Sequence, residues 1–130
     1  DYSEVSVVKA RAVNRAAIAG GRCEILRAGV TELPFTDAAY DIVTALETVY
    51  FWSDPRKSFG EVRRVLKDGG TFLICNECGN HVKGEKWTDK IEGMSVYDGN
   101  ELKNALEETG FRDIKIHENE RGWLCVTARK

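Results

Sequence analysis

The amino-acid sequence predicts an α/β protein with a mainly parallel β-sheet. Two near-continuous apolar runs, residues 40–46 and 71–75, have the composition of strands buried on both faces. Segments in which apolar residues recur at helical spacing alternate with these runs. The last two strand-like segments, residues 113–117 and 123–128, are separated by a short polar stretch and predict an antiparallel hairpin. Such alternation is typical of α/β folds.

Composition limits the class of protein. The chain of 130 residues is enough for one domain, and we expect a single domain over residues 1–130. It is 42% hydrophobic and 31% charged, which is typical of a globular protein with a core. The net charge of −2 is spread along the chain, so no basic block indicates nucleic acid or a membrane as partner. The polar N-terminus does not resemble a signal peptide, and we expect a cytoplasmic protein.

The N-terminal third is expected to form a helix and then a short strand. Ser3 can cap a helix that runs to about Ala19, where two glycines end it. A strand is expected at residues 23–27. Residues 33–39 are rich in turn-forming residues and connect this strand to the apolar run at 40–46.

The second predicted helix has the clearest start in the chain. Asp54 stands at the capping position and Pro55 at the first helical position. Residues 67–70 are expected to end this helix before the strand at 71–75.

Two further segments complete the prediction. Residues 76–96 show no clear period and are rich in Gly, Lys, Glu and Asn, so we expect an irregular loop. Asp98 followed by Glu101 has the spacing of a capping box, and it predicts a third helix that ends near Gly110.

Three of the four cysteines lie in apolar strand-like runs, which indicates buried thiols in a reducing compartment. Cys75 and Cys78 have C-x-x-C spacing, but the pair straddles the end of a predicted strand instead of preceding a helix. Together with His81 these residues are too few for a zinc site, so no metal is expected.

Four short motifs follow one another in a specific order. They are Asp1-Tyr2-Ser3-Glu4, Leu33-Pro34-Phe35 followed by Tyr40-Asp41-Ile42-Val43, Glu61–Gly70 (EVRRVLKDGG), and Glu107–Phe111 (EETGF). In this order and spacing they resemble the class I S-adenosylmethionine-dependent methyltransferases, especially the small-molecule branch. The resemblance implies a Rossmann-like methyltransferase sheet, mostly parallel, with a C-terminal antiparallel hairpin.

The resemblance also implies an N-terminally truncated fold. The family's first strand and glycine-rich loop, which wraps the methionine end of the cofactor, would lie upstream of Asp1, and no G-x-G spacing occurs in the chain. The family's first and second strands lie in the middle of its sheet. Without them, the segment 23–27 would lack a neighbour and the strand 40–46 would become an exposed apolar edge. Because such edges pair with other chains, we expect a homodimer through these strands.

The cofactor implied by the resemblance is S-adenosylmethionine. Six residues at the expected strand ends are implied as its contacts: Asp1, Tyr2, Gly29, Val30, Leu46 and Glu47. Asp1 would accept hydrogen bonds from the ribose hydroxyls, and Gly29 takes the place of an acidic residue that often binds the adenine amino group. The carboxylate of Glu47 could favour the positive sulfur. The alternatives are a solvated chain end for Asp1, a packing residue for Tyr2 and a solvated loop acid for Glu47.

Four residues are candidates for binding a small-molecule methyl acceptor: Tyr50, Phe51, Trp52 and His81. The aromatic cluster could form a wall for an apolar or cationic acceptor, or it could pack against the following helix. His81 could be a general base or a plain exposed histidine.

Several charged residues are expected to be structural. Asp41 at the start of a strand is expected to satisfy backbone donors. Arg63, Arg64 and Lys67 are expected to form a solvated helix face.

The leading functional hypothesis is methyl transfer to a small molecule by in-line displacement, for which positioning matters most. No catalytic residue is assigned, because a base is needed only if the nucleophile loses a proton. The segment after the strand 40–46 is not the N/D-P-P-Y/F pattern of methylases that act on amino groups of nucleic acids and proteins. The alternatives are an inactive fragment or interaction module that retains part of the fold, and a nicotinamide dehydrogenase on a similar sheet.

Overall fold

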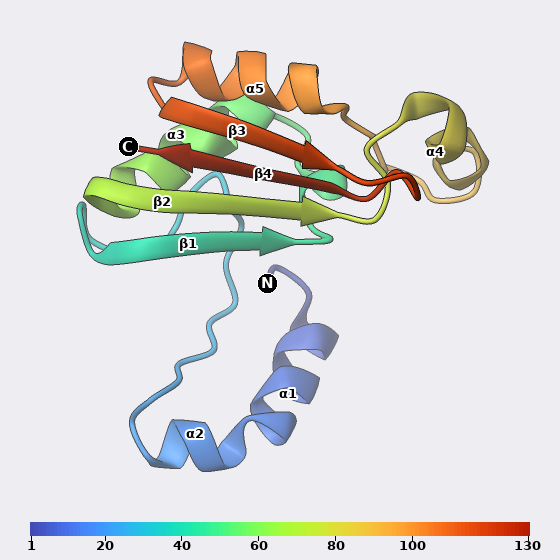
Figure 1. Ribbon diagram of the computed structural model, residues 1–130. Coiled ribbons are helices and arrows are strands. Elements are labelled where there is room, and N and C mark those ends of the chain that lie inside the picture. Colours follow the sequence, from blue (N-terminus) through green and yellow to red (C-terminus); the bar gives the residue numbers. More distant parts are fainter.

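A four-stranded mixed sheet forms the centre of the computed structural model, which describes residues 1–130 (Figure 1). The strands are β1 (Tyr40–Leu46), β2 (Leu66–Asn76), β3 (Arg112–Glu118) and β4 (Leu124–Arg129), and their order in the sheet is β1-β2-β4-β3. β1 pairs with β2 in parallel, whereas β4 is antiparallel to both β2 and β3.

The prediction of a mainly parallel sheet is therefore wrong, and the C-terminal hairpin is confirmed. A short connection joins β3 to β4, and because strands joined by such a hairpin run in opposite directions, the two are antiparallel. Because β4 also inserts between β2 and β3, its direction sets two of the three pairings.

Two helices, α3 (Pro55–Val65) and α5 (Gly99–Glu108), cover one face of the sheet (Figure 1). The core lies between these helices and the sheet and is formed by buried apolar side chains, among them Phe59, Phe72, Ile74, Leu102, Leu106 and Val126. Along β2, Phe72 and Ile74 are buried in this core, while the alternate residues Leu73 and Cys75 are half-buried on the other face. Burial of this apolar surface is the main force that holds the helices on the sheet.

β1 lies at one edge of the sheet and is more exposed than expected. Ile42 is 63% exposed and Leu46 is 57% exposed, so the expectation of a strand buried on both faces is wrong. Only alternate residues of β1, Val43 and Ala45, pack against the core. The exposed apolar edge that the family resemblance implied at this strand is confirmed.

The segment 23–27 does not form the predicted strand. No neighbouring strand offers backbone partners, so side chains and the chain terminus bind its carbonyls instead. The Arg11 guanidinium donates two hydrogen bonds to the carbonyl of Ile25, at 3.0 and 2.8 Å. The N-terminal ammonium of Asp1 donates to the carbonyl of Leu26 at 3.3 Å.

The first predicted helix is divided into α1 (Glu4–Val13) and α2 (Arg15–Ala19). The Ser3 cap is confirmed, because its hydroxyl accepts a hydrogen bond from the backbone N–H of Ser6 at 3.3 Å. Asn14 ends α1, and its side-chain amide donates to the carbonyl of Ala10 at 2.9 Å. An asparagine that bonds its own backbone in this way competes with helix continuation.

The start of α3 is as predicted, but its end is earlier. The Asp54 carboxylate accepts from the N–H of Lys57 at 3.0 Å, with Pro55 in the first turn. β2 begins directly after the helix, at Leu66, so residues 67–70 belong to the irregular first part of this strand. Gly70 is required there, because a Cβ atom would lie 2.8 Å from the carbonyl of Lys67.

The region 76–96 contains a helix, α4 (His81–Thr88), where a loop was expected. Asn80 caps α4 by accepting from the N–H of Lys83 at 3.2 Å. Gly84 lets the helix approach Val96, whose Cγ2 would lie 2.6 Å from a Cβ at this glycine. By contrast, the capping box of Asp98 and Glu101 at the start of α5 is confirmed.

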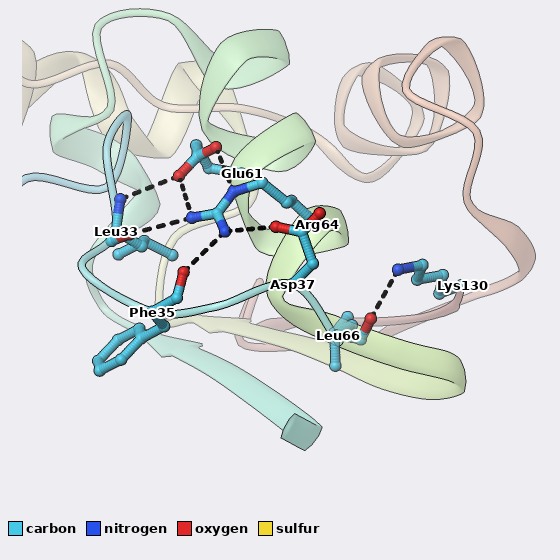
Figure 2. A network of polar contacts seen from close by, with 7 residues as sticks. All are labelled: Leu33, Phe35, Asp37, Glu61, Arg64, Leu66 and Lys130. Carbon is cyan, nitrogen blue, oxygen red and sulfur yellow. Dashed lines mark hydrogen bonds and ion pairs between the residues drawn. The ribbon is translucent and has the colours of Figure 1, made fainter. Parts of the chain in front are cut away.

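Arg64 and Glu61 of α3 hold the connection 33–37 against the helix (Figure 2). The guanidinium donates from Nε and one terminal nitrogen to both carboxylate oxygens of Glu61, each at 2.9 Å. It also donates to the carbonyls of Leu33 and Phe35 and to the carboxylate of Asp37, at 3.0, 2.7 and 2.8 Å. All five guanidinium N–H groups are therefore in use.

The expectation of a solvated face for Arg63, Arg64 and Lys67 is wrong. Arg63 donates to the carbonyl of Gly110 at 3.3 Å. Lys67 donates to both carboxylate oxygens of Asp41 at 2.9 Å, so this ammonium, and not a backbone donor, is the partner of Asp41. These side chains connect α3 and β2 to neighbouring segments through the carbonyl and carboxylate oxygens that those segments present.

No helix in the structure combines the length and the apolar character that a bilayer-spanning helix needs.

We expect the Glu61→Gln substitution to reduce the free energy of unfolding at pH 7 by about 1–2 kcal/mol, because it removes a charge-assisted, partly buried pair. Hydrogen bonds from Arg64 and from the Leu33 N–H lower the pKa of Glu61 from 4.5 to about 2. Its ionisation therefore stabilises the fold above about pH 4.5, and this contribution is lost as the pH falls towards 2.

Urea denaturation at several pH values tests this expectation. The stability difference between wild type and Glu61→Gln should be largest at pH 7 and should narrow below pH 4.5. Glu107→Gln is the matched control, because Glu107 is exposed and its ion pair with Lys103 is long, at 3.8 Å. A pH-independent difference for Glu61→Gln would contradict the proposed ionisation.

Candidate functional site

A cavity of about 460 Å³ lies where β1 and β2 end. Glu47, Cys75, Asn76 and Glu77 line it from these strand ends. The remaining lining residues come from the β3–β4 hairpin: His117, Glu118, Asn119, Trp123, Leu124 and Cys125. Ligands of α/β sheets bind at the carboxyl ends of parallel strands, so this cavity is the candidate site.

Glu47 joins the two strand ends. Its backbone has a φ of 56°, in the left-handed region that non-glycine residues rarely adopt. Its N–H donates to the carbonyl of Cys75 at 2.9 Å, and its carboxylate accepts from the N–H of Glu77 at 2.7 Å. The carboxylate is thus held at the cavity by both strand ends, and strained backbone of this kind clusters at functional sites.

Asn76 is a cavity residue that the sequence reasoning missed. It is 2% exposed, and neither its side-chain oxygen nor its nitrogen has a hydrogen-bond partner within the protein. A buried amide without a partner is unfavourable by roughly 1–3 kcal/mol. The available signal was a polar residue that closes the apolar run at 71–75.

Tyr50 and Trp52 of the aromatic cluster are mainly packing residues. The Tyr50 hydroxyl accepts from the N–H of Cys78 at 2.8 Å and donates to the carbonyl of the same residue at 3.2 Å. Burial raises the pKa of Tyr50 to about 12, so the phenol stays protonated. Trp52 stacks on Phe72 in the core, with ring centroids 6.3 Å apart. Phe51 is the most exposed of the three, at 43%, and none of them lines the cavity.

The residues proposed for the adenosine end gather at the N-terminus. The carbonyl of Asp1 accepts from the N–H of Ala28 at 3.0 Å, and its carboxylate accepts from the N–H of Ser3 at 2.8 Å. Asp1 is therefore held next to the segment that contains Gly29 and Val30. A Cβ at Gly29 would meet open space, and Val30 packs against the core.

These N-terminal residues do not line the cavity. Tyr2 is 68% exposed and does not form a packed wall. Leu46 is exposed at the end of β1, next to Glu47. Of the six predicted cofactor residues, only Glu47 lines the cavity.

His81 lies at the start of α4 and faces Glu101 at the start of α5. The His81 Nε2 and a carboxylate oxygen of Glu101 are 2.7 Å apart. With Asp98 they form a cluster of three potential metal ligands. Both carboxylates already cap α5, and the positive end of a helix dipole disfavours a cation, so we assign no metal site. His81 does not line the cavity.

Comparison with known proteins identifies the family of this chain. The family model described as a methyltransferase domain matches residues 1–74. The chain is 28% identical over 119 residues to O-methyltransferase resE of Aspergillus sclerotiorum, which covers 88% of this chain and 45% of that protein. It is 30% identical over 107 residues to cycloartenol-C-24-methyltransferase 1 of Oryza sativa subsp. japonica, which covers 82% of this chain and 30% of that protein.

A solved structure shows the same fold. It is geranyl diphosphate C-methyltransferase from Streptomyces coelicolor A3(2), in complex with Mg²⁺, geranyl diphosphate and S-adenosyl-L-homocysteine. The TM-score is 0.79 at 15% identity, and the match covers 98% of this chain and 62% of the other.

We expect Glu47→Gly to be more stable than Glu47→Ala by about 1 kcal/mol, because only glycine adopts the left-handed conformation without strain. Both variants lose the carboxylate, so their difference reports the backbone alone. Chemical denaturation measures it. Lys103→Gly and Lys103→Ala, inside α5, are the matched pair, and there alanine should be the more stable. If Glu47→Ala is the more stable of its pair, the left-handed turn is not retained.

Proposed function

The chain belongs to the methyltransferase domain family, and we propose that it transfers a methyl group from S-adenosylmethionine to a small-molecule acceptor by in-line displacement. The chain spans 45% and 30% of the length of the two curated relatives above, so the activity of the whole protein is part of the proposal. The observation that carries it is Glu47, whose carboxylate is held beside the cavity at the carboxyl end of β1.

Asp1 and Gly29 are proposed to contact the nucleoside end of the cofactor. One carboxylate oxygen of Asp1 accepts the Ser3 N–H, which leaves the other for the ribose hydroxyls. A Cβ atom at Gly29 would meet no heavy atom within 4 Å, so the position proposed for the adenine contact is not closed at this residue. No G-x-G loop for the methionine end occurs in these 130 residues. When bound, the sulfonium of S-adenosylmethionine supplies an activated methyl group.

Glu47 is proposed to act through its charge. Because two strand ends hold it, its carboxylate is oriented before any ligand arrives. Preorganised charge of this kind stabilises an opposite charge more effectively than mobile solvent does. In this proposal Glu47 favours a positively charged sulfur near the end of β1.

The acceptor is proposed to be a small, neutral or cationic molecule. The cavity is lined by the carboxylates of Glu47, Glu77 and Glu118 and by no lysine or arginine, so an anionic acceptor would be repelled. The unpartnered amide of Asn76 can donate and accept a hydrogen bond. The printed names of the relatives, an O-methyltransferase and a cycloartenol-C-24-methyltransferase, also describe proteins that act on small molecules or on oxygen.

The protein's proposed contribution to the reaction is mainly positional. The walls of the cavity would hold the acceptor in line with the methyl group, and such alignment can supply much of the rate enhancement. We assign no general base. The alternative function is an inactive fragment or interaction module that retains this part of the fold.

Calorimetric titration with S-adenosylhomocysteine separates the two functions. We expect binding near the micromolar range, and Glu47→Gln should weaken S-adenosylmethionine by about fivefold while it leaves S-adenosylhomocysteine unchanged, because only the former carries the positive sulfur. Glu92→Gln, an exposed acid outside the cavity, is the control. Absence of binding at millimolar ligand would support the alternative function, and equal loss for both ligands would refute the role of the Glu47 charge.

A second proposal concerns assembly. The outer edge of β1 has no neighbouring strand, and beside it the exposed side chains of Ile42 and Leu46 lie on the face of the sheet opposite to the core. Exposed apolar edges of this kind favour pairing with another strand. We therefore propose a homodimer through β1 alone, because the segment 23–27 forms no strand that could contribute. A reducing, cytoplasmic location is also proposed, and the four free cysteines support it.

Light scattering coupled to size exclusion tests the dimer. We expect a mass of twice the 14.6 kDa chain, and Ile42→Lys should shift the protein towards the monomer because it places two like charges at the paired edge. Val82→Lys, at an exposed position on α4, should leave the mass unchanged. A monodisperse monomer for the wild-type chain would refute the proposal.

A further inference from the structure

The thiols of Cys75 on β2 and Cys125 on β4 face each other across the sheet. The two residues are direct partners in the antiparallel register, and their sulfur atoms are 3.2 Å apart. Cys78, the other half of the C-x-x-C spacing, is not involved, because its sulfur contacts the carbonyl of Asn80 at 3.5 Å. The partner of Cys75 is therefore 50 residues away in the sequence.

We propose that Cys75 and Cys125 are a thiol–disulfide site, which closes to a reversible cross-strand disulfide when the protein meets an uncharged low-molecular-weight disulfide such as bis(2-hydroxyethyl) disulfide. This proposal is independent of methyl transfer.

The backbone geometry already suits the bond. Directly opposed residues of an antiparallel pair have Cα atoms roughly 4.5–5.5 Å apart. This range lies within the roughly 4.4–6.8 Å found for disulfides. The sulfurs must approach by about 1.1 Å to reach the bonded distance of about 2.05 Å, which small rotations of the two side chains can supply.

The reagent also has access to the pair. Both cysteines are only half-buried, and both line the cavity at the end of β1 and β2. With a volume of about 460 Å³, the cavity admits a small disulfide. A buried thiol without such an opening would be inert.

The exchange balances with one equivalent of the small disulfide. The Cys125 thiolate attacks one of its sulfurs, which forms a mixed disulfide and releases the first small thiol. The Cys75 thiolate then attacks the Cys125 sulfur, the protein disulfide forms, and the second small thiol leaves. Two protein thiols are oxidised, the small disulfide is reduced to two thiols, and the two protein protons end on these products.

The environment of Cys75 determines how the experiment is run. Burial, followed by the hydrogen bond and the charge of Cys125 and by the charge of Glu47, raises the pKa of Cys75 to about 11. Once Cys125 is in the mixed disulfide, it no longer raises the pKa of Cys75 through the thiol hydrogen bond or the thiolate charge. A buffer at about pH 8.5 provides more thiolate than a neutral one.

The test uses the Cys23→Ser/Cys78→Ser double variant, which retains only the two cysteines in question. After incubation with bis(2-hydroxyethyl) disulfide and quenching with N-ethylmaleimide, we expect an intact mass about 2 Da below that of the reduced chain and no maleimide adduct. Dithiothreitol should then restore two reactive thiols. Two maleimide adducts, or a hydroxyethylthio group retained on either cysteine, would overturn the proposal.

Peptide mapping identifies the bond. Trypsin places Cys75 in residues 68–83 and Cys125 in residues 122–129, so we expect these two peptides to be joined. Cys78 shares the first peptide, and in the wild-type chain a bond confined to residues 68–83 would refute the pairing. The oxidised double variant should also melt roughly 5 °C or more above its reduced form, since the bond closes a long loop. An unchanged melting temperature would contradict a link between β2 and β4.

Discussion

The pair of Arg64 and Glu61 on α3 is the interaction on which much of the structure depends. The connection 33–37 has no secondary structure of its own, and its position is set by bonds to these two side chains (Figure 2). β1 follows this connection directly, so the same bonds influence where the edge strand enters the sheet. The planar guanidinium suits this role, since its five donors have fixed directions and lysine offers no equivalent.

The carboxyl ends of β1 and β2 are joined by a second, smaller set of contacts. Glu47 turns the chain in a left-handed conformation and bonds the end of β2 with both its backbone and its carboxylate. The Tyr50 hydroxyl adds a further contact between the segments that follow β1 and β2, because it bonds both the N–H and the carbonyl of Cys78. These bonds fix the end of β1 to the end of β2 on one side of the cavity, while its other lining residues come from the β3–β4 hairpin. A site assembled from distant segments in this way depends on the whole sheet.

Local signals in the sequence were reliable where a residue acts on its own neighbours. The caps at Ser3, Asp54 and Asp98 each bond a backbone N–H within three residues, and all three helices begin where these residues predict. The segment 23–27 shows the opposite case. Its composition is that of a strand, but a strand needs partners, and composition does not report whether partners are present.

In the candidate site, too, local features could be predicted from the sequence and contacts between distant segments could not. The sequence indicated Glu47, which directly follows an apolar strand, and the family motifs were sufficient for an α/β methyltransferase-like fold and for the family, but not for the direction of the strands. It left open whether Tyr50 and Trp52 pack inside, and it did not indicate that Asn76 is buried without a partner or that Cys75 meets Cys125 instead of Cys78. Each of these features depends on which distant segment of the chain lies next to the residue in the folded protein.

The sequence by itself determined the starts of α1, α3 and α5 and the C-terminal hairpin, and its motifs indicated the methyltransferase domain family and the exposed β1 edge. Only the tertiary structure decided the direction of the sheet pairings, the helix at 81–88 and the bonding of Arg64. The physical reason is the separation along the chain of the residues that interact. Caps and hairpins are specified by residues a few positions apart, whereas pairings between strands and the burial of polar side chains are selected by contacts between segments far apart in the chain.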